Sequence, residues 1–336
     1  MTQLLHIAAS TPSERIWIHP FCEALREIGT LTILANGQAM SEETLTARIR
    51  GCDILLTGWG SVRIPEAVAE DPVNLGYVCN VTGTVLSFVP LSIIEAGIPV
   101  TNWGDAPAGR VAEGALTLTL ACLKGLRQRI AFMREGGWQL PDSFYSGVME
   151  GLPIGVYGYG YIGQRYVEML RPFHPQVSIF DPFVKTIPDW CERVDNLETL
   201  FDRAELVAVH AGLTEQTAGS IGADLLARLP DDGVIINTAR GAIFDQQALF
   251  AELEDGRLRA GLDVLDPDIL PEDHPARGWE NVIVTAHDIS KYRPRDGFPP
   301  KHMIGMHRIC LDNLRRYLAG EPLQFTMDRE RYLRST

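Results

Sequence analysis

The chain has 336 residues, of which 46% are hydrophobic and 22% charged, and its formal net charge is −13. This length and composition are ordinary for a folded protein of two domains, and they exclude a disordered, collagen-like or coiled-coil chain. The acidic balance disfavours nonspecific binding to nucleic acid or to anionic lipid. We therefore expect neither nucleic acid nor a membrane as a partner, while a local basic pocket for a small anion stays open.

The cysteines and the uncharged stretches bear on the location of the protein. Six cysteines are scattered along the chain without a C-x-x-C pair. This pattern predicts reduced thiols in a cytoplasmic protein rather than a disulfide framework or a zinc site, and no metal is expected. Residues 1–10 lack a basic stretch and a cleavage motif, so we expect no signal peptide. Residues 72–94 carry no charge, but prolines and glycines interrupt them, which indicates strand, loop and helix inside a core.

The first hundred residues alternate short apolar runs with helical periodicity. Serines stand where two predicted helices begin, Ser13 for a helix that reaches residue 28 and Ser41 for a helix that reaches residue 49. Strands are predicted at 4–8, 31–34, 53–56 and 75–79. Repeated units of strand and helix favour a parallel sheet covered by helices on both sides.

A second series of elements follows a long helix predicted for 107–134, which could bridge two domains or lie at a subunit interface. Its strands are predicted at 153–157, 177–180, 206–209, 234–237, 260–264 and 282–285. These six parallel strands are what a full dinucleotide-binding sheet needs. A tail helix at 300–318 could return the chain to the first domain. The sequence thus predicts an α/β protein in which a doubly wound Rossmann domain, 104–290, is inserted in a flavodoxin-like domain, 1–103 plus 291–336.

A glycine-rich loop follows the first strand of the second series. Its glycines are Gly158, Gly160 and Gly163, and a helical stretch comes directly after them. The first glycine allows a tight turn, the second lets backbone approach a pyrophosphate, and the third lets the helix pack on the strand. Asp181, after the next strand, can accept hydrogen bonds from ribose hydroxyls and repels a 2′-phosphate, which favours NAD over NADP. The alternative is a plain glycine turn with a solvated Asp-Pro turn.

Three polar residues each follow a strand of the predicted sheet: Arg240, Asp268 and His287. In an open parallel sheet, that edge binds the ligand. The guanidinium can grip a carboxylate and an adjacent carbonyl, and the imidazole can donate a proton to the carbonyl oxygen as a hydride reaches its carbon. The carboxylate can hold the ring and favour its protonated form. Taken singly, the three could also be a turn cap, a loop carboxylate and a structural histidine.

Residues 152–290 resemble the NAD-binding domain of the D-isomer-specific 2-hydroxyacid dehydrogenases. The resemblance is carried by the stretches 155–163, 236–242, 260–264, and 273–275 with 281–287. The stretch that begins at Arg110 also resembles the start of the interdomain helix of the family. The resemblance implies that Arg240 binds the substrate and that His287 is the acid/base. It places Asp268 where the family has glutamate, so we expect a contact with His287 that is looser or shifted.

The same resemblance implies further contacts. Asp263 matches the position that contacts the nicotinamide carboxamide, and the backbone of Gly83 and Thr84 falls where the family binds the substrate carboxylate. The remaining cofactor contacts implied by the family are Tyr161 and Ile162, through their backbone, and Thr238 and Ala239.

Three other features are open to two interpretations. The loop 210–213 lacks the proline usual in the family, which predicts a more flexible cofactor loop. The basic residues Lys291, Arg293, Arg295 and Lys301 could reach an anionic substrate or lie on a surface loop. Trp59 could wall a substrate pocket or simply pack.

The resemblance implies an NAD-dependent oxidoreductase that interconverts a 2-oxo acid and a D-2-hydroxy acid, with a cleft between its domains. The helix 107–134 and the segment 136–145, which holds Trp138 and Phe144, suggest a homodimer. Two alternatives stay open: another enzyme class that shares a C-terminal Rossmann domain, and an NAD(H)-binding regulatory protein of the same fold without dehydrogenase turnover.

Overall fold

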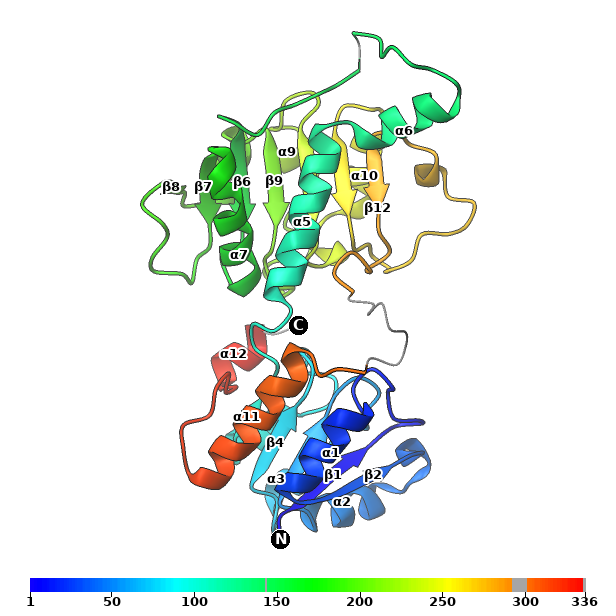
Figure 1. Cartoon of the computed structure of the whole chain (residues 1–336). Helices are drawn as coiled ribbons and strands as arrows, with labels where there is room; N and C mark the ends of the chain where they lie inside the picture. Colours follow the sequence, from blue (N-terminus) through cyan, green and yellow to red (C-terminus); the bar gives the residue numbers. More distant parts are fainter. Residues whose placement is uncertain (143, 292–300, 335–336) are drawn as a thin grey trace. The chain divides into compact units, whose positions relative to one another are not determined.

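The computed structural model describes residues 1–142, 144–291 and 301–334 (Figure 1). The chain divides into two compact units. Unit 1 comprises Met1–Pro107 and Tyr292–Thr336, and unit 2 comprises Ala108–Lys291. The boundaries thus follow residues 107 and 291, where the sequence suggested 103 and 290.

Unit 1 is built on one parallel sheet of five strands, in the order β2-β1-β3-β4-β5. The strands are β1 (Gln3–Ile7), β2 (Thr30–Leu34), β3 (Ile54–Thr57), β4 (Tyr77–Asn80) and β5 (Val100–Thr101). This order is the flavodoxin-like one, in which the first strand lies beside the second and third. The first four strands match predicted runs, whereas β5 is too short to leave a periodic signal.

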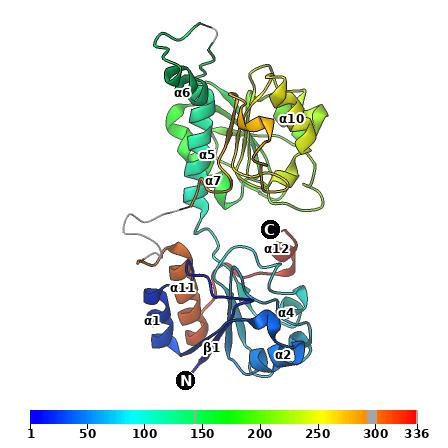
Figure 2. The same cartoon turned by 90° about the vertical axis from the view of Figure 1, so that its right-hand side faces the viewer.

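Helices cover both faces of this sheet, as Figure 2 shows. One face is covered by α1 (His19–Ile28) and α11 (Gly305–Ala319). The other is covered by α2 (Glu42–Arg50), α3 (Ala67–Glu70) and α4 (Leu91–Glu95). A last helix, α12 (Arg329–Arg334), packs against α4. The tail therefore returns to the first unit, and both faces of the sheet are buried.

The two predicted serine caps have different outcomes. Ser41 caps α2, since its Oγ accepts a 3.2 Å hydrogen bond from the Thr44 N–H. The prediction for Ser13 is wrong, because α1 begins only at His19. Pro20 explains the difference: it has no N–H to donate to an upstream carbonyl, so a helix can start at this proline but cannot run through it.

Unit 2 is built on a parallel sheet of seven strands, in the order β12-β11-β10-β9-β6-β7-β8. The strands are β6 (Pro153–Tyr157), β7 (Gln176–Phe180), β8 (Cys191–Arg193), β9 (Leu206–Val209), β10 (Val234–Asn237), β11 (Arg259–Leu262) and β12 (Val282–Val284). Read from β8, this is the Rossmann order, in which the chain reverses direction across the sheet between β6 and β9. The strand β8 was not predicted, because it is an edge strand of three residues, two of them charged.

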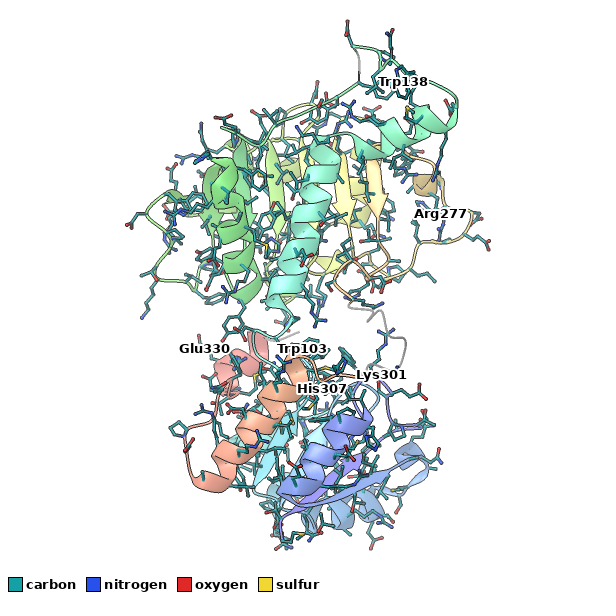
Figure 3. All side chains as sticks on the ribbon, in the orientation of Figure 1. Trp103, Trp138, Arg277, Lys301, His307 and Glu330 are labelled. Carbon is teal, nitrogen blue, oxygen red and sulfur yellow. The ribbon has the colours of Figure 1, made fainter. Side chains whose placement is uncertain are left out.

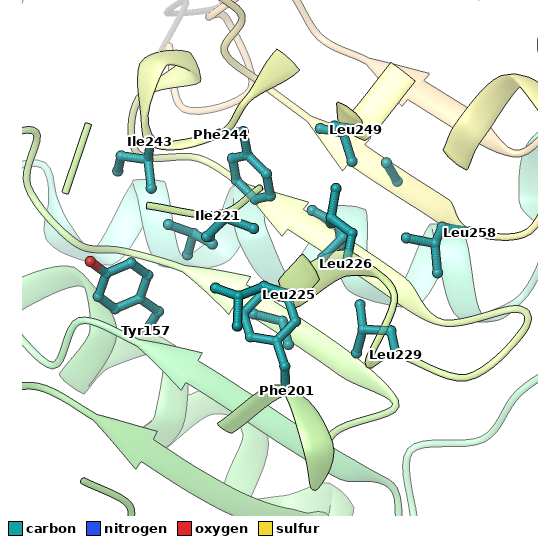
Figure 4. Close-up of a cluster of buried hydrophobic side chains, with 14 of the residues drawn as sticks. Tyr157, Phe201, Ile221, Leu225, Leu226, Leu229, Ile243, Phe244, Leu249 and Leu258 are labelled. Atoms are coloured by element: carbon teal, nitrogen blue, oxygen red, sulfur yellow. The ribbon is translucent and has the colours of Figure 1, made fainter. Parts of the chain in front are cut away.

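Alternate residues of the central strands bury opposite faces of this sheet. In β9, Leu206 and Ala208 face one core, whereas Val207 and Val209 face the other. The first core is closed by α5 (Ala108–Leu123) and α7 (Tyr161–Leu170). The second is closed by α8 (Leu197–Asp202), α9 (Ala223–Leu226) and α10 (Gln246–Glu254), and Figure 4 shows its side chains. Burial on both faces explains the continuous apolar runs of the sequence.

The long helix predicted for 107–134 is two helices. α5 ends at Leu123, and α6 (Leu126–Arg134) begins after Gly125, whose φ of 52° is left-handed. Apolar spacing continues across the break, so periodicity could not reveal it, whereas glycine adopts this backbone without steric cost. Among the helices of the described residues, none combines the length and apolarity that crossing a membrane requires.

Candidate active site

The glycine loop joins β6 to α7 at the point where the strand order reverses. Gly158 has a φ of 94°, and a side chain there would overlap the backbone of Ala211, which follows β9. A side chain at Gly163 would overlap the Gly158 carbonyl. Gly160 is different, because a Cβ built there meets no atom within 4 Å among the described residues. Two glycines thus pack the loop tightly, and the third leaves space for a ligand at the start of α7.

Asp181 follows β7 and is tied to the glycine loop. Its Oδ2 accepts a 2.7 Å hydrogen bond from the Tyr159 N–H, and its Oδ1 accepts from the N–H groups of Phe183 and Val184. These bonds hold the Asp181 carboxylate at the end of β7, where the sequence predicts that it binds the cofactor ribose. Tyr161 and Ile162, for which a backbone contact with the cofactor is predicted, lie in the first turn of α7.

Polar atoms without partners mark the same edge of the sheet. The Thr238 hydroxyl, after β10, and both ring nitrogens of His210, after β9, are buried and have no hydrogen-bond partner in the described part of the chain. Burial lowers the pKa of His210 to about 3, so its ring is neutral at pH 7. Because buried polar groups are rarely left unpaired, these atoms, with the space at Gly160, fit a dinucleotide.

Arg240 follows β10 in a turn held by its neighbours. The Asn237 side chain donates to the Arg240 carbonyl at 3.0 Å and accepts from the Ala239 N–H at 3.0 Å. A side chain at Gly241 would overlap the backbone of Leu265, so the glycine admits the loop that carries Asp268. Burial lowers the pKa of the Arg240 guanidinium, and the nearby Asp268 carboxylate partly offsets this effect.

His287 and Asp268 are hydrogen-bonded to each other. The Nδ1 of His287 lies 2.6 Å from Oδ2 of Asp268, and 51% and 47% of the two side chains are exposed. A looser or shifted contact was expected for the shorter side chain, and the looser alternative is wrong. A 3.2 Å hydrogen bond from the Leu265 N–H to Asp268 Oδ1 also holds this carboxylate. Within the described residues, the Nε2 of His287 has no hydrogen-bond partner.

Asp263 holds the turn that presents His287. Only 3% exposed, it accepts at Oδ1 from the Thr285 hydroxyl at 2.6 Å and from the N–H groups of Asp288 and Ile289. Ala286 and His287 both have left-handed backbones, with φ of 51° and 54°, which L-residues adopt only under constraint. For Asp263 the sequence predicts a cofactor contact, but no sequence pattern indicates this bracing role.

The loop after β4 in unit 1 carries Gly83 and Thr84. The N–H groups of Gly83, Thr84 and Val85 donate to no acceptor among the described residues. Three consecutive unpaired N–H groups at the carboxyl end of a strand can bind an anion such as a carboxylate.

The structure also locates the features that were open to two interpretations. Lys291 pairs with Asp288 at 3.0 Å, which favours the surface interpretation for this residue, and Lys301 is exposed. Arg293 and Arg295 lie outside the described residues. Trp59 is 40% exposed and meets Trp103 edge-on, with ring centroids 5.4 Å apart.

Comparisons with known proteins identify unit 2. Residues 116–288 match the family described as D-isomer specific 2-hydroxyacid dehydrogenase, NAD binding domain. A solved 2-hydroxyacid dehydrogenase from Ketogulonicigenium vulgare Y25 is 25% identical, with a TM-score of 0.76, and the alignment covers 98% of this chain and 99% of that chain.

Two curated relatives are similar in sequence to this chain. D-3-phosphoglycerate dehydrogenase from Methanocaldococcus jannaschii is 31% identical over 268 residues, and hydroxypyruvate reductase from Thermotoga maritima is 34% identical over 197 residues. The alignments cover 78% and 57% of this chain, but only 50% and 63% of the two relatives. The family match spans more than half of the chain and contains the glycine loop, Arg240, Asp268 and His287. The chain therefore belongs to the D-isomer specific 2-hydroxyacid dehydrogenase family, whose NAD binding domain is unit 2.

Proposed function

We propose that the protein is an NAD-dependent oxidoreductase that interconverts a 2-oxo acid and a D-2-hydroxy acid. The observation that carries the proposal is the 2.6 Å hydrogen bond between Asp268 and His287. The same Asp268 carboxylate also acts electrostatically on the Arg240 guanidinium and partly offsets the lowering of its pKa by burial. A positioned acid/base and a cation on the edge of a dinucleotide-binding sheet form the set that carbonyl reduction needs.

The cofactor sites belong to the same proposal. The Gly158–Gly163 loop and the first turn of α7, Tyr161 and Ile162, would bind the pyrophosphate, and Asp181 the adenosine ribose. Thr238, Ala239 and Asp263 would contact the nicotinamide side of NAD. Bound NADH supplies the hydride that reduces the substrate carbonyl carbon.

The reacting atoms would be handled by three side chains. Arg240 would grip the carboxylate and the 2-oxo oxygen by two N–H groups, which orients the carbonyl. His287, with its Nδ1–H fixed on Asp268, would donate a proton from Nε2 to the developing alkoxide and take it back in the reverse reaction. In unit 1, the N–H groups of Gly83 and Thr84 would bind the substrate carboxylate.

The test is NADH oxidation, followed by absorbance, with a panel of 2-oxo acids that includes glyoxylate, hydroxypyruvate, phosphohydroxypyruvate and branched and aromatic members. We expect turnover with at least one acid and formation of the D-hydroxy product. NADH binding without turnover on any acid would instead support the NAD(H)-binding regulator. The direct Asp268–His287 contact and the enzymatic relatives favour the enzyme.

We propose that the protein is a homodimer held by α6 and the segment that follows it. The apolar side chains Leu126, Ile130 and Met133 recur along one side of α6 and are each nearly half exposed, and Trp138 is 83% exposed (Figure 3). Such a stripe is typical of an interface. Light scattering on a variant with Ile130→Glu and Trp138→Glu would yield a monomer, whereas an unchanged mass would contradict this interface.

We also propose that the protein is located in the cytoplasm. All six cysteines are free thiols, five of them buried, which suits the reducing cytoplasm.

A further inference from the structure

The anion-binding loop of unit 1 is held in place by two asparagines. The Asn80 Nδ2 donates to the carbonyls of Thr82 at 2.8 Å and Thr84 at 3.0 Å. The Asn102 Nδ2 donates to the carbonyl between them, that of Gly83, at 2.9 Å. The three consecutive carbonyls of the loop are therefore all bound by asparagine side chains.

Binding these carbonyls determines where the N–H groups point. A trans peptide group is planar, and its N–H points opposite to its carbonyl. The peptide that joins Gly83 to Thr84 has its carbonyl on Asn102, so the Thr84 N–H points away from that asparagine. The same geometry directs the N–H groups of Gly83 and Val85 away from Asn80. The asparagines thereby keep three donors available for an anion without contacting the anion themselves.

Both asparagines are buried and held by further contacts. Asn80 is 1% exposed, and its Oδ1 accepts from the Thr57 hydroxyl at 3.0 Å. Asn102 accepts at Oδ1 from the Gly104 N–H at 3.0 Å and from Nη2 of Arg331 at 3.0 Å. The frame of the loop therefore includes a residue from the far end of the chain.

Arg331 belongs to α12, which is fastened at this end of the sheet. Its Nη1 donates to the Thr326 carbonyl at 2.8 Å, and the Tyr332 hydroxyl donates to the Val89 carbonyl, four residues beyond Val85, at 2.8 Å. Figure 3 labels Glu330 of α12 and Trp103, the neighbour of Asn102, at the same end of unit 1. The C-terminal helix thus contacts the loop's support on one side and its continuation on the other.

We infer that Asn102 and Arg331 are positioning residues for the carboxylate of the substrate: Arg331 orients the Asn102 amide, and Asn102 orients the Gly83–Thr84 peptide. The C-terminal helix is then part of the substrate-binding frame rather than a surface appendage. This inference rests on the proposed function for its substrate, a 2-oxo acid, but its geometry lies entirely within unit 1.

The test is a titration of the full chain with oxalate, a dicarboxylate that resembles the oxo acid. Tryptophan fluorescence is the readout, because the Trp103 indole packs directly against the loop. A Cβ built on Gly83 would lie only 2.5 Å from this ring. The variants are Asn102→Ala, Arg331→Gln and Arg331→Lys. The matched control is Arg329→Gln, which lies on the same helix but pairs with Glu95 at 3.2 Å.

We expect the Kd for oxalate to rise at least roughly tenfold in Asn102→Ala, which leaves a carbonyl unpaired, and about threefold in Arg331→Gln. Arg331→Lys, which keeps one donor for Asn102, regains part of the affinity, and Arg329→Gln binds as the parent does. In variants with turnover, the KM for the oxo acid rises by the same factors while the KM for NADH stays constant.

Three results would overturn the inference: no saturable oxalate binding by the parent protein, parental affinity in both Asn102→Ala and Arg331→Gln, or an equal loss in Arg329→Gln. A parent that binds oxalate with the expected variant pattern but reduces no oxo acid would support the frame and contradict the proposed function. Turnover of an oxo acid together with unaltered oxalate affinity in the variants would support the proposed function and contradict the frame.

Discussion

The main-chain oxygen of Asp263 accepts a 2.5 Å hydrogen bond from the His287 N–H, while its carboxylate grips the residues on either side of that histidine. Asp263, which is buried and directly follows β11, thereby connects the end of that strand to the left-handed turn at 286–287. The position of the His287 imidazole depends on this connection as much as on its bond to Asp268.

Replacing Asp263 by alanine therefore disturbs His287 without touching its ring. The change leaves two partly buried N–H groups and a hydroxyl without their acceptor. We therefore expect a loss of stability of about 2–4 kcal/mol and a fall in kcat. Asp263→Asn keeps an oxygen that can accept from these donors, so it should regain much of the stability and much of the kcat. Thermal unfolding and steady-state kinetics of the two variants measure the effects, and parental kcat in Asp263→Ala would contradict the bracing role.

Arg240→Ala removes the proposed grip on the substrate. Because bonds to charged groups contribute roughly 1.5–3 kcal/mol each, kcat/KM should fall at least about tenfold, chiefly through the KM for the oxo acid. Arg240→Lys keeps the charge but loses the forked geometry and should regain little. Arg228→Ala, which removes only a surface pair with Asp202, is the control. Unchanged kinetics in Arg240→Ala would exclude the residue from the site.

Asp181→Ser bears on the choice between NADH and NADPH. The substitution removes the negative charge expected at the adenosine ribose and weakens the bond to the Tyr159 N–H. The Kd for NADH should rise roughly tenfold, and the preference for NADH over NADPH should shrink, because repulsion of the 2′-phosphate is relieved. Cofactor fluorescence titrations measure both affinities. A parent protein that prefers NADPH would overturn this assignment.

The prediction of the fold from sequence succeeded where local pattern and burial agree. Apolar runs located nearly all central strands, because strands buried on both faces read as continuous hydrophobic segments. It failed at Gly125 and at Pro20, where one residue's backbone requirement overrides the periodicity around it, and at β8, an edge strand with charged residues.

The site shows the same division between local and long-range information. Arg240, Asp268 and His287 were proposed as one site because each lies beyond the end of a strand, and the ends of parallel strands converge on one edge. The contact of Arg331 with Asn102 joins residues 229 positions apart in the sequence, and no spacing along the chain encodes it. The bracing role of Asp263 is likewise a product of tertiary structure.

Buried histidines make the stability of the protein depend on pH. Burial lowers the pKa of His6 and of His307 to about 4 each, below the value near 6.5 of an unfolded chain. Between these values only the unfolded state binds the proton, so the stabilisation is complete above about pH 6.5 and is lost as pH falls toward 4. We expect a loss of about 2 kcal/mol per histidine at pH 5.

Thermal unfolding at pH 7.5 and pH 5 tests this expectation. His6→Asn keeps a donor for the Leu56 carbonyl, which His6 Nδ1 contacts at 3.0 Å, but does not titrate. Its unfolding should therefore change less with pH than that of the parent protein. An equal pH dependence in the two proteins would show that His6 does not contribute.

Deuterium transfer tests the central claim, that His287 donates the proton while the cofactor reduces a 2-oxo acid. The parent protein, given NADH deuterated at the transferring C4 position and a reactive oxo acid, should form a D-2-hydroxy acid with deuterium at C2. His287→Asn should bind NADH normally but lose roughly a hundredfold or more in kcat. A product without deuterium, or parental turnover in His287→Asn, would contradict the account.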